Sequence, residues 1–428
     1  MPYLRRISPI RASLEPLFGV LKRHLMACTV ILLWLVAVGC TSSEATIGRK
    51  APSVPTGYET TGTVPKATQA ANSDAMNGAK SDSATSYRTH SLVGYYAYWM
   101  KGAWIDMDLR VYDRIVFFTT TPGSDGRMQA RNGWPHAWVG LLTRADSLDI
   151  PVVPALALLE PDSIKSLFSS HDAISNLLET SLLLIEESKG MGVHLDIELF
   201  ESVTDSLRDN FISFTDSLAE QALRRWPDAM LSMFTPAFDN DGLYDLSRIH
   251  EGYKQLMVQG YDLHWQTGPQ SGPVSALKGW GGANWESIVD RYRNEGLDDS
   301  RLVMTIPYYG YEWPVESDSV GSSTKGTAKI TTFAAVDSLV LPQYRINIQS
   351  RINQHGLQRD SVSGSPFYSF SDSSGFWQGW FEDTHSLEQK YSFIKEAGLK
   401  GVATFPMGYD QGILDAHMNG YFGPKRKK

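Results

Sequence analysis

The chain has 428 residues, of which 42% are hydrophobic and 20% are charged, and its formal net charge is -8. This composition is that of a folded protein with a sizeable core, and it excludes disorder throughout the chain. The negative balance gives no electrostatic reason to expect a nucleic-acid partner, because binding to a polyanion needs a basic surface that releases counterions. The short basic run KRKK at the C-terminus does not change this balance.

Residues 1–40 have the pattern of an export signal. Basic residues between Arg5 and Arg23 precede the apolar run LMACTVILLWLVAVGC, which is short for a membrane span and suits a signal-peptide core. A transmembrane anchor is the alternative. Met1 and Met26 are both candidate start residues.

The end of this run, AVGC, resembles a bacterial lipobox, in which the cysteine is lipid-modified and becomes the first mature residue. That resemblance implies a lipoprotein held in a bacterial membrane through lipidated Cys40, exposed at the outer membrane or the cell surface. The chain has two cysteines, and cleavage before Cys40 would remove Cys28, so the mature protein would contain no internal disulfide.

Residues 41–90 are rich in Ser, Thr, Ala, Gly and Pro and contain almost no large apolar side chains. Such a segment cannot bury enough surface to fold, and we expect a flexible tether here. The remaining residues, 91–428, are expected to form one domain.

Beyond the tether, short apolar runs rich in β-forming residues alternate with amphipathic helical patterns. The helical patterns span residues 171–190, 204–226, 285–296 and 386–398. Eight strand candidates begin at Leu92, Arg114, Ile150, Gly192, Ala229, Gln255, Arg301 and Gly401. This alternation predicts an α/β fold of the (β/α)8 TIM barrel type, and a doubly wound open sheet with extra strands is the main alternative.

One connection is much longer than the others. Residues 312–381, between the seventh and eighth strand candidates, contain KITTFAAVDSL and PFYSFSDSSGFWQGWFED between Ser-rich segments. A structureless loop of this length is uncommon inside a compact domain. We therefore expect an inserted small α+β subdomain, or long hairpins over the barrel mouth.

Two acids interrupt the apolar run GVHLDIELF. The period of two places His194, Asp196 and Glu198 on one face of the fourth strand candidate. On a half-buried surface strand these residues would simply face water. In a barrel, however, residues at the C-terminal strand ends line the site, where Tyr261 and Asp262 of the sixth candidate would meet the two acids. Because an isolated buried acid is costly, this placement favours a ligand site.

Several stretches, in order, resemble family 18 of the glycoside hydrolases. GVHLDIE resembles the family's fourth-strand motif D-G-x-D-x-D-x-E, whose final D-x-E falls on Asp196 and Glu198. VGYYAYW resembles the first strand, QGYDLHW the sixth with its M-x-Y-D motif, MTIPYYGYEW the seventh, and FEDTHSLEQKYSFIKEAGLKGVATFPMGYDQG the last helix and strand. The similarity runs from about Leu92 to the end, and the long insertion lies where many members carry a small α+β domain.

This resemblance implies hydrolysis, with retention, of a β-1,4 bond that follows an N-acetylglucosamine unit. The substrate's own acetamido oxygen attacks the anomeric carbon, which is an exception to the usual two-carboxylate scheme. By the resemblance, Glu198 is the general acid that later activates water, and Asp196 orients the acetamido group and stabilises the oxazolinium charge. Tyr261 donates its hydroxyl to the acetamido carbonyl, Asp262 contacts the sugar or that carbonyl, and Tyr95 shapes the pocket.

The chain also departs from the family pattern. The first motif Asp is Met191, the middle one is His194, the Met of M-x-Y-D is Gln259, and the usual Trp floor of the last strand is Phe405. We expect a neutral His194 to donate a hydrogen bond to Asp196, and a protonated one to keep Asp196 ionised. Gln259 suggests a more polar pocket wall.

Tryptophans near strand ends or in long loops are candidate stacking surfaces for sugars, and packing inside the fold is the equal alternative for each of them. We expect Trp265 first, because it follows the sixth-strand motif by a few residues. The other candidates are Trp99, Trp104, Trp134, Trp313 and Trp377.

The substrates implied are N-acetylglucosamine-containing glycans: chitin oligosaccharides, peptidoglycan-derived chains or the core of N-linked glycans. A catalytically inactive glycan-binding protein on the same fold is the alternative, but retention of Asp196, Glu198 and Tyr261 favours the hydrolase. The ten His show no H-E-x-x-H spacing, and no G-x-S-x-G elbow occurs. We therefore expect no metal and no cofactor, and we expect a monomer.

Overall fold

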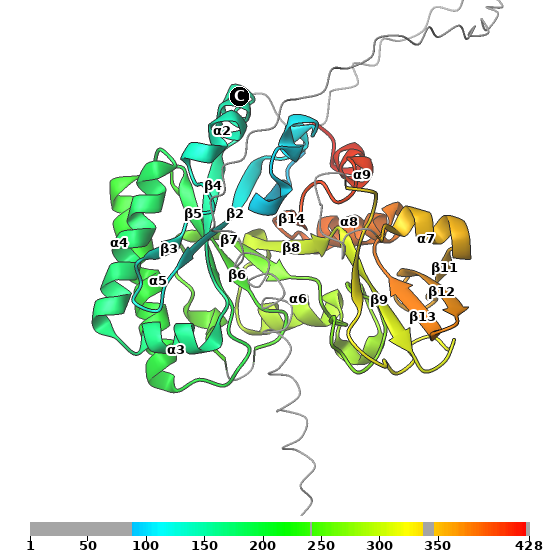
Figure 1. The fold of residues 1–428 in the computed structure, drawn as a ribbon. Helices are drawn as coiled ribbons and strands as arrows, with labels where there is room; N and C mark the ends of the chain where they lie inside the picture. Colours follow the sequence, from blue (N-terminus) through cyan, green and yellow to red (C-terminus); the bar gives the residue numbers. More distant parts are fainter. Residues whose placement is uncertain (1–87, 240–241, 337–345, 425–428) are drawn as a thin grey trace, which may run out of the picture.

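The computed structural model describes residues 88–239, 242–336 and 346–424. The predicted signal segment, the lipobox with Cys40, and the tether up to residue 87 lie outside these described residues, so these predictions stay predictions. The described residues form a barrel with a smaller sheet attached to one side (Figure 1).

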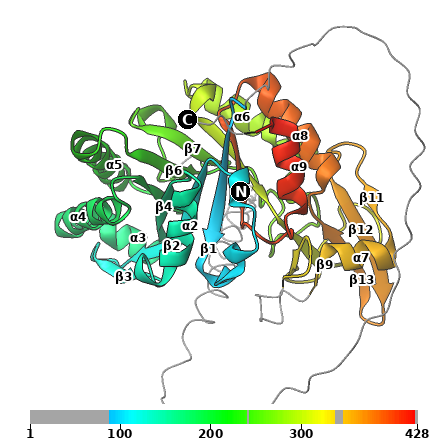
Figure 2. The same cartoon turned by 90° about the horizontal axis from the view of Figure 1, so that it is seen from above.

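Eight parallel strands form the barrel, and the prediction of a (β/α)8 fold is confirmed. Each strand is hydrogen-bonded to the next in the order β1, β14, β8, β7, β6, β5, β4, β2, and the pairing of β1 with β2 closes the ring (Figure 2). An open sheet is excluded because each of the eight strands has a parallel neighbour on both edges, which leaves no edge strand among them. The strands are β1 (Ser91–Ala97), β2 (Arg114–Pro122), β4 (Val152–Leu158), β5 (Gly192–Ile197), β6 (Met230–Thr235), β7 (Tyr253–Gln259), β8 (Leu302–Pro307) and β14 (Gly401–Phe405).

Helices surround the ring, and the four predicted helical patterns correspond to α4, α5, α6 and α8. Side-chain caps fix where several begin: Ser170 caps α4, Thr204 caps α5, and Asp383 forms a capping box with Ser386 at α8. The helices around the barrel are α2 (Val139–Ser147), α3 (Pro161–Phe168), α4 (His171–Glu187), α5 (Asp205–Arg225), α6 (Trp285–Asn294), α8 (Thr384–Ala397) and α9 (Ile413–Phe422).

The alternation of strands and helices is less regular than predicted. Between β1 and β2 the chain forms three 3-10 turns, η1 (Tyr98–Met100), η2 (Ala103–Ile105) and η3 (Leu109–Val111). The described part of the β6–β7 connection contains η5 (Leu246–Arg248). Both connections are rich in Gly, Asp, Asn or Pro, which favour turns over continuous helix.

The long insertion is an α+β subdomain, one of the two predicted alternatives. Its antiparallel sheet has the order β10, β9, β13, β12, β11, and α7 (Ile348–His355) packs against β12. It begins earlier than predicted, since β9 starts at Tyr309, directly after β8. The subdomain lies beside α8 and α9 in both views (Figures 1 and 2). Its strands are β9 (Tyr309–Val315), β10 (Lys329–Thr332), β11 (Gln358–Arg359), β12 (Pro366–Asp372) and β13 (Gly375–Trp380).

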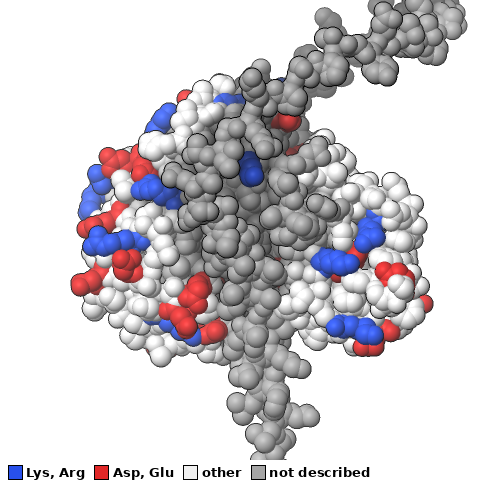
Figure 3. Space-filling view, in the orientation of Figure 1, with Lys and Arg blue, Asp and Glu red and all other residues white. Residues whose placement is uncertain are grey.

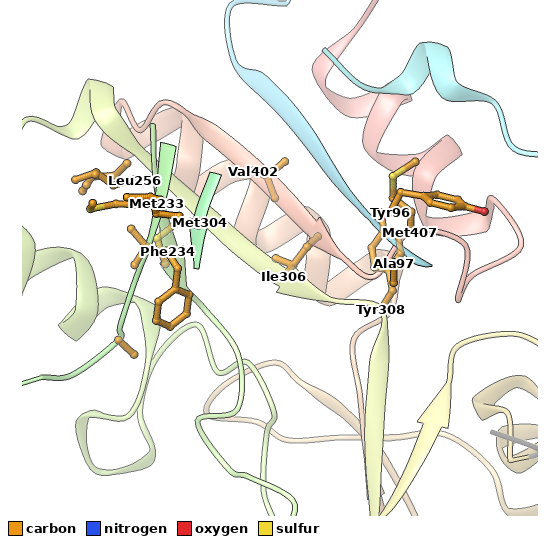
Figure 4. Close-up of a cluster of buried hydrophobic side chains, with 14 of the residues drawn as sticks. Tyr96, Ala97, Met233, Phe234, Leu256, Met304, Ile306, Tyr308, Val402 and Met407 are labelled. Carbon is orange, nitrogen blue, oxygen red and sulfur yellow. The ribbon is translucent and has the colours of Figure 1, made fainter. Parts of the chain in front are cut away.

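The two faces of the barrel strands bury different side chains. Outward-facing residues such as Met233, Leu256 and Val402 form the larger core between strands and helices (Figure 4). The inward-facing cluster is mostly small, with Val93, Val116, Val153, Ala155, Ala157, Val303 and Ala403 among its members. Small inward residues leave space in the barrel for larger polar side chains, and these form the site described next.

The visible surface carries charges of both signs. In Figure 3, Lys and Arg side chains lie interspersed with Asp and Glu over the helical side of the barrel and over the subdomain. Where the described residues are visible on this face, their charges form no large basic area of the kind that a nucleic-acid backbone requires.

Candidate active site

The two acids of the fourth barrel strand lie at its C-terminal end, as predicted. Asp196 points into the barrel and is only 4% exposed, and it pairs in register with the small Ala157 of β4. Glu198 directly follows the strand, and its backbone N–H donates to the Leu158 carbonyl at 3.1 Å. This last bond extends the pairing of β4 and β5 beyond the strand, so Glu198 is held at the mouth by backbone as well as by side-chain contacts.

Burial shifts the protonation of both acids. It raises the pKa of Glu198 well above its ordinary value, and the nearby charges of Asp196 and Asp262 raise it further. Burial also raises the pKa of Asp196, to about 7, while a hydrogen bond shared with Glu198 opposes that rise. The same hydrogen bond favours the proton on Glu198. As the pH rises above about 7, the pair therefore holds an ionised Asp196 that accepts a hydrogen bond from a protonated Glu198, the state that a general acid needs.

Tyr261 and Asp262 follow the sixth barrel strand, β7, and lie close to the acid pair. Burial raises the pKa of Tyr261 well above its ordinary value, and the charges of Glu198 and Asp196 contribute. Tyr261 therefore keeps its hydroxyl proton and can donate it in a hydrogen bond. The preceding Gly260 allows this placement, because a Cβ there would lie 2.5 Å from the Thr305 carbonyl oxygen.

Asp262 has a left-handed backbone (φ 54°) and binds the inserted subdomain. The hydroxyls of Tyr309 and Tyr311 both donate to its Oδ1, at 2.6 and 2.9 Å. Burial raises the pKa of Asp262 to about 6, and these two hydrogen bonds oppose the rise. Tyr309 and Tyr311, near the start of β9, thus fix the carboxylate of Asp262. These two hydrogen bonds connect the position of the subdomain to the geometry of the site.

His194 does not make the predicted hydrogen bond to Asp196. Its Nε2 lies 3.0 Å from the Tyr95 hydroxyl, and its Nδ1 lies 3.0 Å from the Ser232 hydroxyl, so both ring nitrogens are used elsewhere. Burial lowers the pKa of His194 well below its ordinary value, and the positive charge of Arg114 adds to this effect. The imidazole is therefore neutral at neutral pH. It anchors Tyr95, which was predicted to shape this pocket.

Phe405 lies at the end of β14, in the centre of an aromatic group. The ring of Tyr261 is parallel to it, at an interplanar angle of 9° and a centroid distance of 6.1 Å. Tyr95, Trp99 and Phe118 meet it edge-on, with centroids 5.8, 6.5 and 5.4 Å away. A set of rings therefore forms the floor where the family pattern expects one Trp. Of the predicted Trp candidates, Trp99 belongs to this floor.

The remaining Trp candidates lie in different surroundings. Trp265 is partly buried on the loop after β7, and its indole N–H is buried with no hydrogen-bond partner among the described residues. Trp134 and Trp313 are core residues, 2% and 0% exposed, and so correspond to the packing alternative. Trp377 lies on β13 of the subdomain, where the ammonium of Lys329 is 3.9 Å from its ring centre and the parallel ring of Phe370 has its centroid 6.2 Å away.

Two further candidates are side chains of the barrel wall and its rim. Trp104 is partly buried in η2, and its ring lies against Gly140 of α2, in the outer core rather than in the floor. Gln259 is partly buried at the end of β7, and its amide oxygen accepts a hydrogen bond from the backbone N–H of Ala237 at 3.3 Å. Gln259 therefore connects the loop that follows β6 to the end of β7.

Some site residues were not found from the sequence. Ser232 is the second hydrogen-bond partner of the His194 ring, and Phe118 is part of the aromatic floor around Phe405. Tyr309 and Tyr311 donate hydrogen bonds to Asp262. For the two tyrosines a signal exists: in YYGYE they are two residues apart and share one strand face. Ser232 gives no signal, because a single Ser in an apolar strand is common.

Two further observations concern the described residues only. They contain no group of three or more His, Cys, Asp and Glu side chains arranged to hold a metal ion. Within the same ranges, no helix is both long and apolar enough to cross a membrane.

The shifted pKa values predict a pH profile. If activity needs an ionised Asp196 and a protonated Glu198, kcat/KM should rise as the pH increases through about 7, the pKa of Asp196. It should fall again only at a pH well above the ordinary pKa of a glutamate, when Glu198 loses its proton. Measuring kcat/KM across the pH range tests this, since it reports ionisations of the free enzyme. Full activity retained in acid would contradict it.

Comparison with known proteins identifies relatives. The family model described as glycosyl hydrolases family 18 matches residues 161–410, more than half of the chain. Among curated proteins, a cortical fragment-lytic enzyme of Bacillus anthracis is 20% identical over 243 residues, covering 55% of this chain and 50% of that protein. Di-N-acetylchitobiase of Mus musculus is 21% identical over 218 residues, covering 49% and 59%. The chain thus spans about half the length of the curated relatives it matches.

Solved structures share the fold. A family GH18 chitinase from Cycas revoluta in complex with (GlcNAc)3 aligns with a TM-score of 0.67 at 16% identity, covering 78% of this chain and all of that one. The spore cortex-lytic enzyme of Bacillus megaterium aligns with a TM-score of 0.63 at 20% identity, covering 80% and 76%.

Proposed function

The chain belongs to glycosyl hydrolase family 18, and from this premise we propose that it cleaves the β-1,4 bond after an N-acetylglucosamine unit with retention. The observation that carries the proposal is the buried pair in which a protonated Glu198 donates to Asp196, beside the Tyr261 hydroxyl and above an aromatic floor. A hydrolase of this class needs one acid that is protonated at working pH and one carboxylate that is not.

In the first step the Glu198 carboxyl proton passes to the glycosidic oxygen while the bond from that oxygen to the anomeric carbon breaks. The acetamido carbonyl oxygen attacks the anomeric carbon and forms an oxazolinium ion. Asp196 accepts a hydrogen bond from the acetamido N–H and offsets the positive charge. Tyr261 donates to the acetamido oxygen, and Asp262 contacts the sugar.

In the second step a water molecule attacks the anomeric carbon on the face that the leaving group vacated. Glu198, now ionised, takes a proton from this water, and the oxazolinium ring opens to restore the acetamido group. Two inversions give net retention. The flat rings around Phe405 would support the apolar face of the reacting sugar.

The test is release of reducing ends from a panel of chitooligosaccharides, peptidoglycan and N-linked glycoproteins by the domain from about Ser91. The panel reflects relatives named for chitobiase and cortex-lytic activities. Cleavage of one substrate of the panel, with the β-anomer as the first product seen by NMR, supports the proposal and identifies the substrate. Binding of a glycan from the panel without cleavage of any of them would instead support the alternative, a glycan-binding protein that has lost hydrolase activity.

We also propose that Cys40 is lipid-modified and that residues 41–90 connect it to the barrel in a bacterial membrane. The start of β1 at Ser91 supports this, because it lies at the barrel end opposite the acids, and a tether there would leave the mouth open. Incorporation of a labelled fatty acid into the full chain, but not into Cys40→Ser, is the expected result. Equal labelling of both forms would contradict the proposal.

A further inference from the structure

Tyr244 is a buried residue of the connection between β6 and β7, and its hydroxyl contacts the strand that carries the acids. The hydroxyl donates to the backbone carbonyl of Ile197 at 2.8 Å. Tyr244 is only 6% exposed and Ile197 is fully buried. Ile197 is the last residue of β5 and stands between Asp196 and Glu198 in the chain. The contact therefore joins this connection directly to the peptide that leads to the proposed general acid.

The Ile197 carbonyl lies where β5 has lost its strand partner on one side. The pairing of β5 with β6 ends at Leu195, whereas the pairing with β4 continues to Ile197. The Glu198 N–H points to β4, where it bonds to the Leu158 carbonyl. Because this peptide is trans, the Ile197 carbonyl points the opposite way, to the side of β6. There the Tyr244 hydroxyl takes the place of a strand, so both polar groups of the Ile197–Glu198 peptide have a partner.

The position of the Tyr244 hydroxyl is itself well determined. Its ring meets Phe211 of α5 and Phe234 of β6 edge-on, with centroids 5.2 and 6.3 Å away. Its backbone N–H donates to Oδ2 of Asp239 at 3.0 Å. Burial raises the pKa of Tyr244 well above its ordinary value, and the charges of the acid pair raise it further, so the hydroxyl keeps its proton and remains a donor.

The described part of the same loop is also connected to α6 and β7. Arg291 of α6 donates to the carbonyls of Ala237 and Asp239, at 3.1 and 2.9 Å. The Ala237 N–H donates to Gln259, which lies two residues before Tyr261. Tyr244 thus holds the peptide next to the acid of β5 from a loop that is bonded to the strand leading to Tyr261.

We propose that Tyr244 is a positioning residue, whose hydroxyl fixes the Ile197–Glu198 peptide and thereby directs the Glu198 carboxyl at Asp196 and at the glycosidic oxygen. This inference rests on the proposed function for its catalytic meaning. Placement matters because a displacement of about 1 Å can cost about a hundredfold in rate. Packing alone would not require the hydroxyl, since Phe fills nearly the same space. Tyr244→Phe therefore separates positioning from packing.

Selective labelling isolates the peptide in question. Ile is followed by Glu at two places in the whole sequence, Ile185–Glu186 and Ile197–Glu198. In the full chain labelled with carbonyl-13C isoleucine and 15N glutamate, a carbonyl–amide correlation spectrum therefore shows these two peptides, and Glu186→Gln assigns them by removing one signal. Tyr244→Phe should move the Ile197–Glu198 signal, with the carbonyl at lower chemical shift because it loses a hydrogen bond. The Ile185–Glu186 signal, on α4, should stay in place.

Kinetics with a matched control give the second measurement. On the substrate found with the panel, Tyr244→Phe should lower kcat about tenfold with KM changed less than about twofold, because binding is kept and the acid is misplaced. Tyr253 is fully buried at the start of β7, and its hydroxyl donates to the backbone carbonyl of Thr215 on α5 at 2.9 Å. Tyr253→Phe makes the same chemical change away from the acids, so it should lower the denaturation midpoint similarly and leave kcat unchanged.

The outcomes separate this inference from the proposed function. An unmoved Ile197–Glu198 signal in Tyr244→Phe would overturn the inference, whether or not the chain hydrolyses a glycan. A moved signal with wild-type kcat, or an equal fall of kcat in Tyr253→Phe, would overturn the positioning role. If Tyr244→Phe does not fold, Asp239→Ala, which removes the acceptor of the Tyr244 N–H, must give the same selective change. Absence of hydrolase activity in the wild type would overturn the proposed function, while the NMR signal would still decide whether Tyr244 holds the peptide.

Discussion

Glu198→Gln is expected to lower kcat/KM for a natural β-1,4 bond by at least about a hundredfold, the usual contribution of a positioned general acid. Gln has nearly the same shape and keeps a donor, but it cannot transfer a proton to a leaving sugar hydroxyl. The loss should be much smaller for a nitrophenyl glycoside, because a phenolate leaves without protonation. Initial rates on both substrates give the comparison.

A matched control separates this effect from damage to the fold. Glu220 is exposed on α5, and Glu220→Gln makes the same chemical change far from the mouth, so its kcat/KM should stay at the wild-type value. An equal loss for Glu198→Gln on both substrates would show that Glu198 is not the acid. Unchanged activity of Glu198→Gln would exclude the proposed mechanism.

Asp196→Asn is expected to lower kcat by about a hundredfold, because the amide cannot offset the developing positive charge of the oxazolinium ion. It should also change the pH profile. The charge of Asp196 and its hydrogen bond both raise the pKa of Glu198, so removing the charge lowers that pKa. The alkaline limb of kcat/KM should therefore move to lower pH, measured as a complete profile of the residual activity.

The sign of this shift is specific to the coupled pair. Asp290→Asn, at a largely exposed carboxylate on α6, should leave both the rate and the profile unchanged. A reduced rate with an unmoved alkaline limb would show that the two carboxyls do not share a proton. In that case the protonation of Glu198 would have to come from burial and from the charge of Asp262.

Much of the fold could be predicted from the sequence. Each of the eight barrel strands has an apolar run of its own, and the four predicted helices carry apolar residues at helical spacing that is bounded by caps or glycine. These are local patterns, and local patterns determine where elements lie. The irregular connection between β1 and β2 was missed because eight strands suggested eight equal units, whereas its Gly and Asp residues favour turns.

Part of the candidate site could be predicted from the sequence. The period of two along GVHLDIE placed His194, Asp196 and Glu198 on one face, and the barrel rule placed that face at the mouth. Neither pattern shows which side chains bond to each other. His194 was expected to bond to Asp196, its neighbour on the same strand face, but in the barrel it bonds to Tyr95 and Ser232 from other strands.

The sequence by itself therefore determined the order of the strands, the position of the insertion and the face that carries the acids, because these follow from periodicity within short segments. The tertiary structure alone decided the partners of His194 and the fixing of Asp262 by Tyr309 and Tyr311. It also decided the protonation of Glu198 and Asp196. These properties depend on burial and on charges from distant strands, which come together only when the barrel closes.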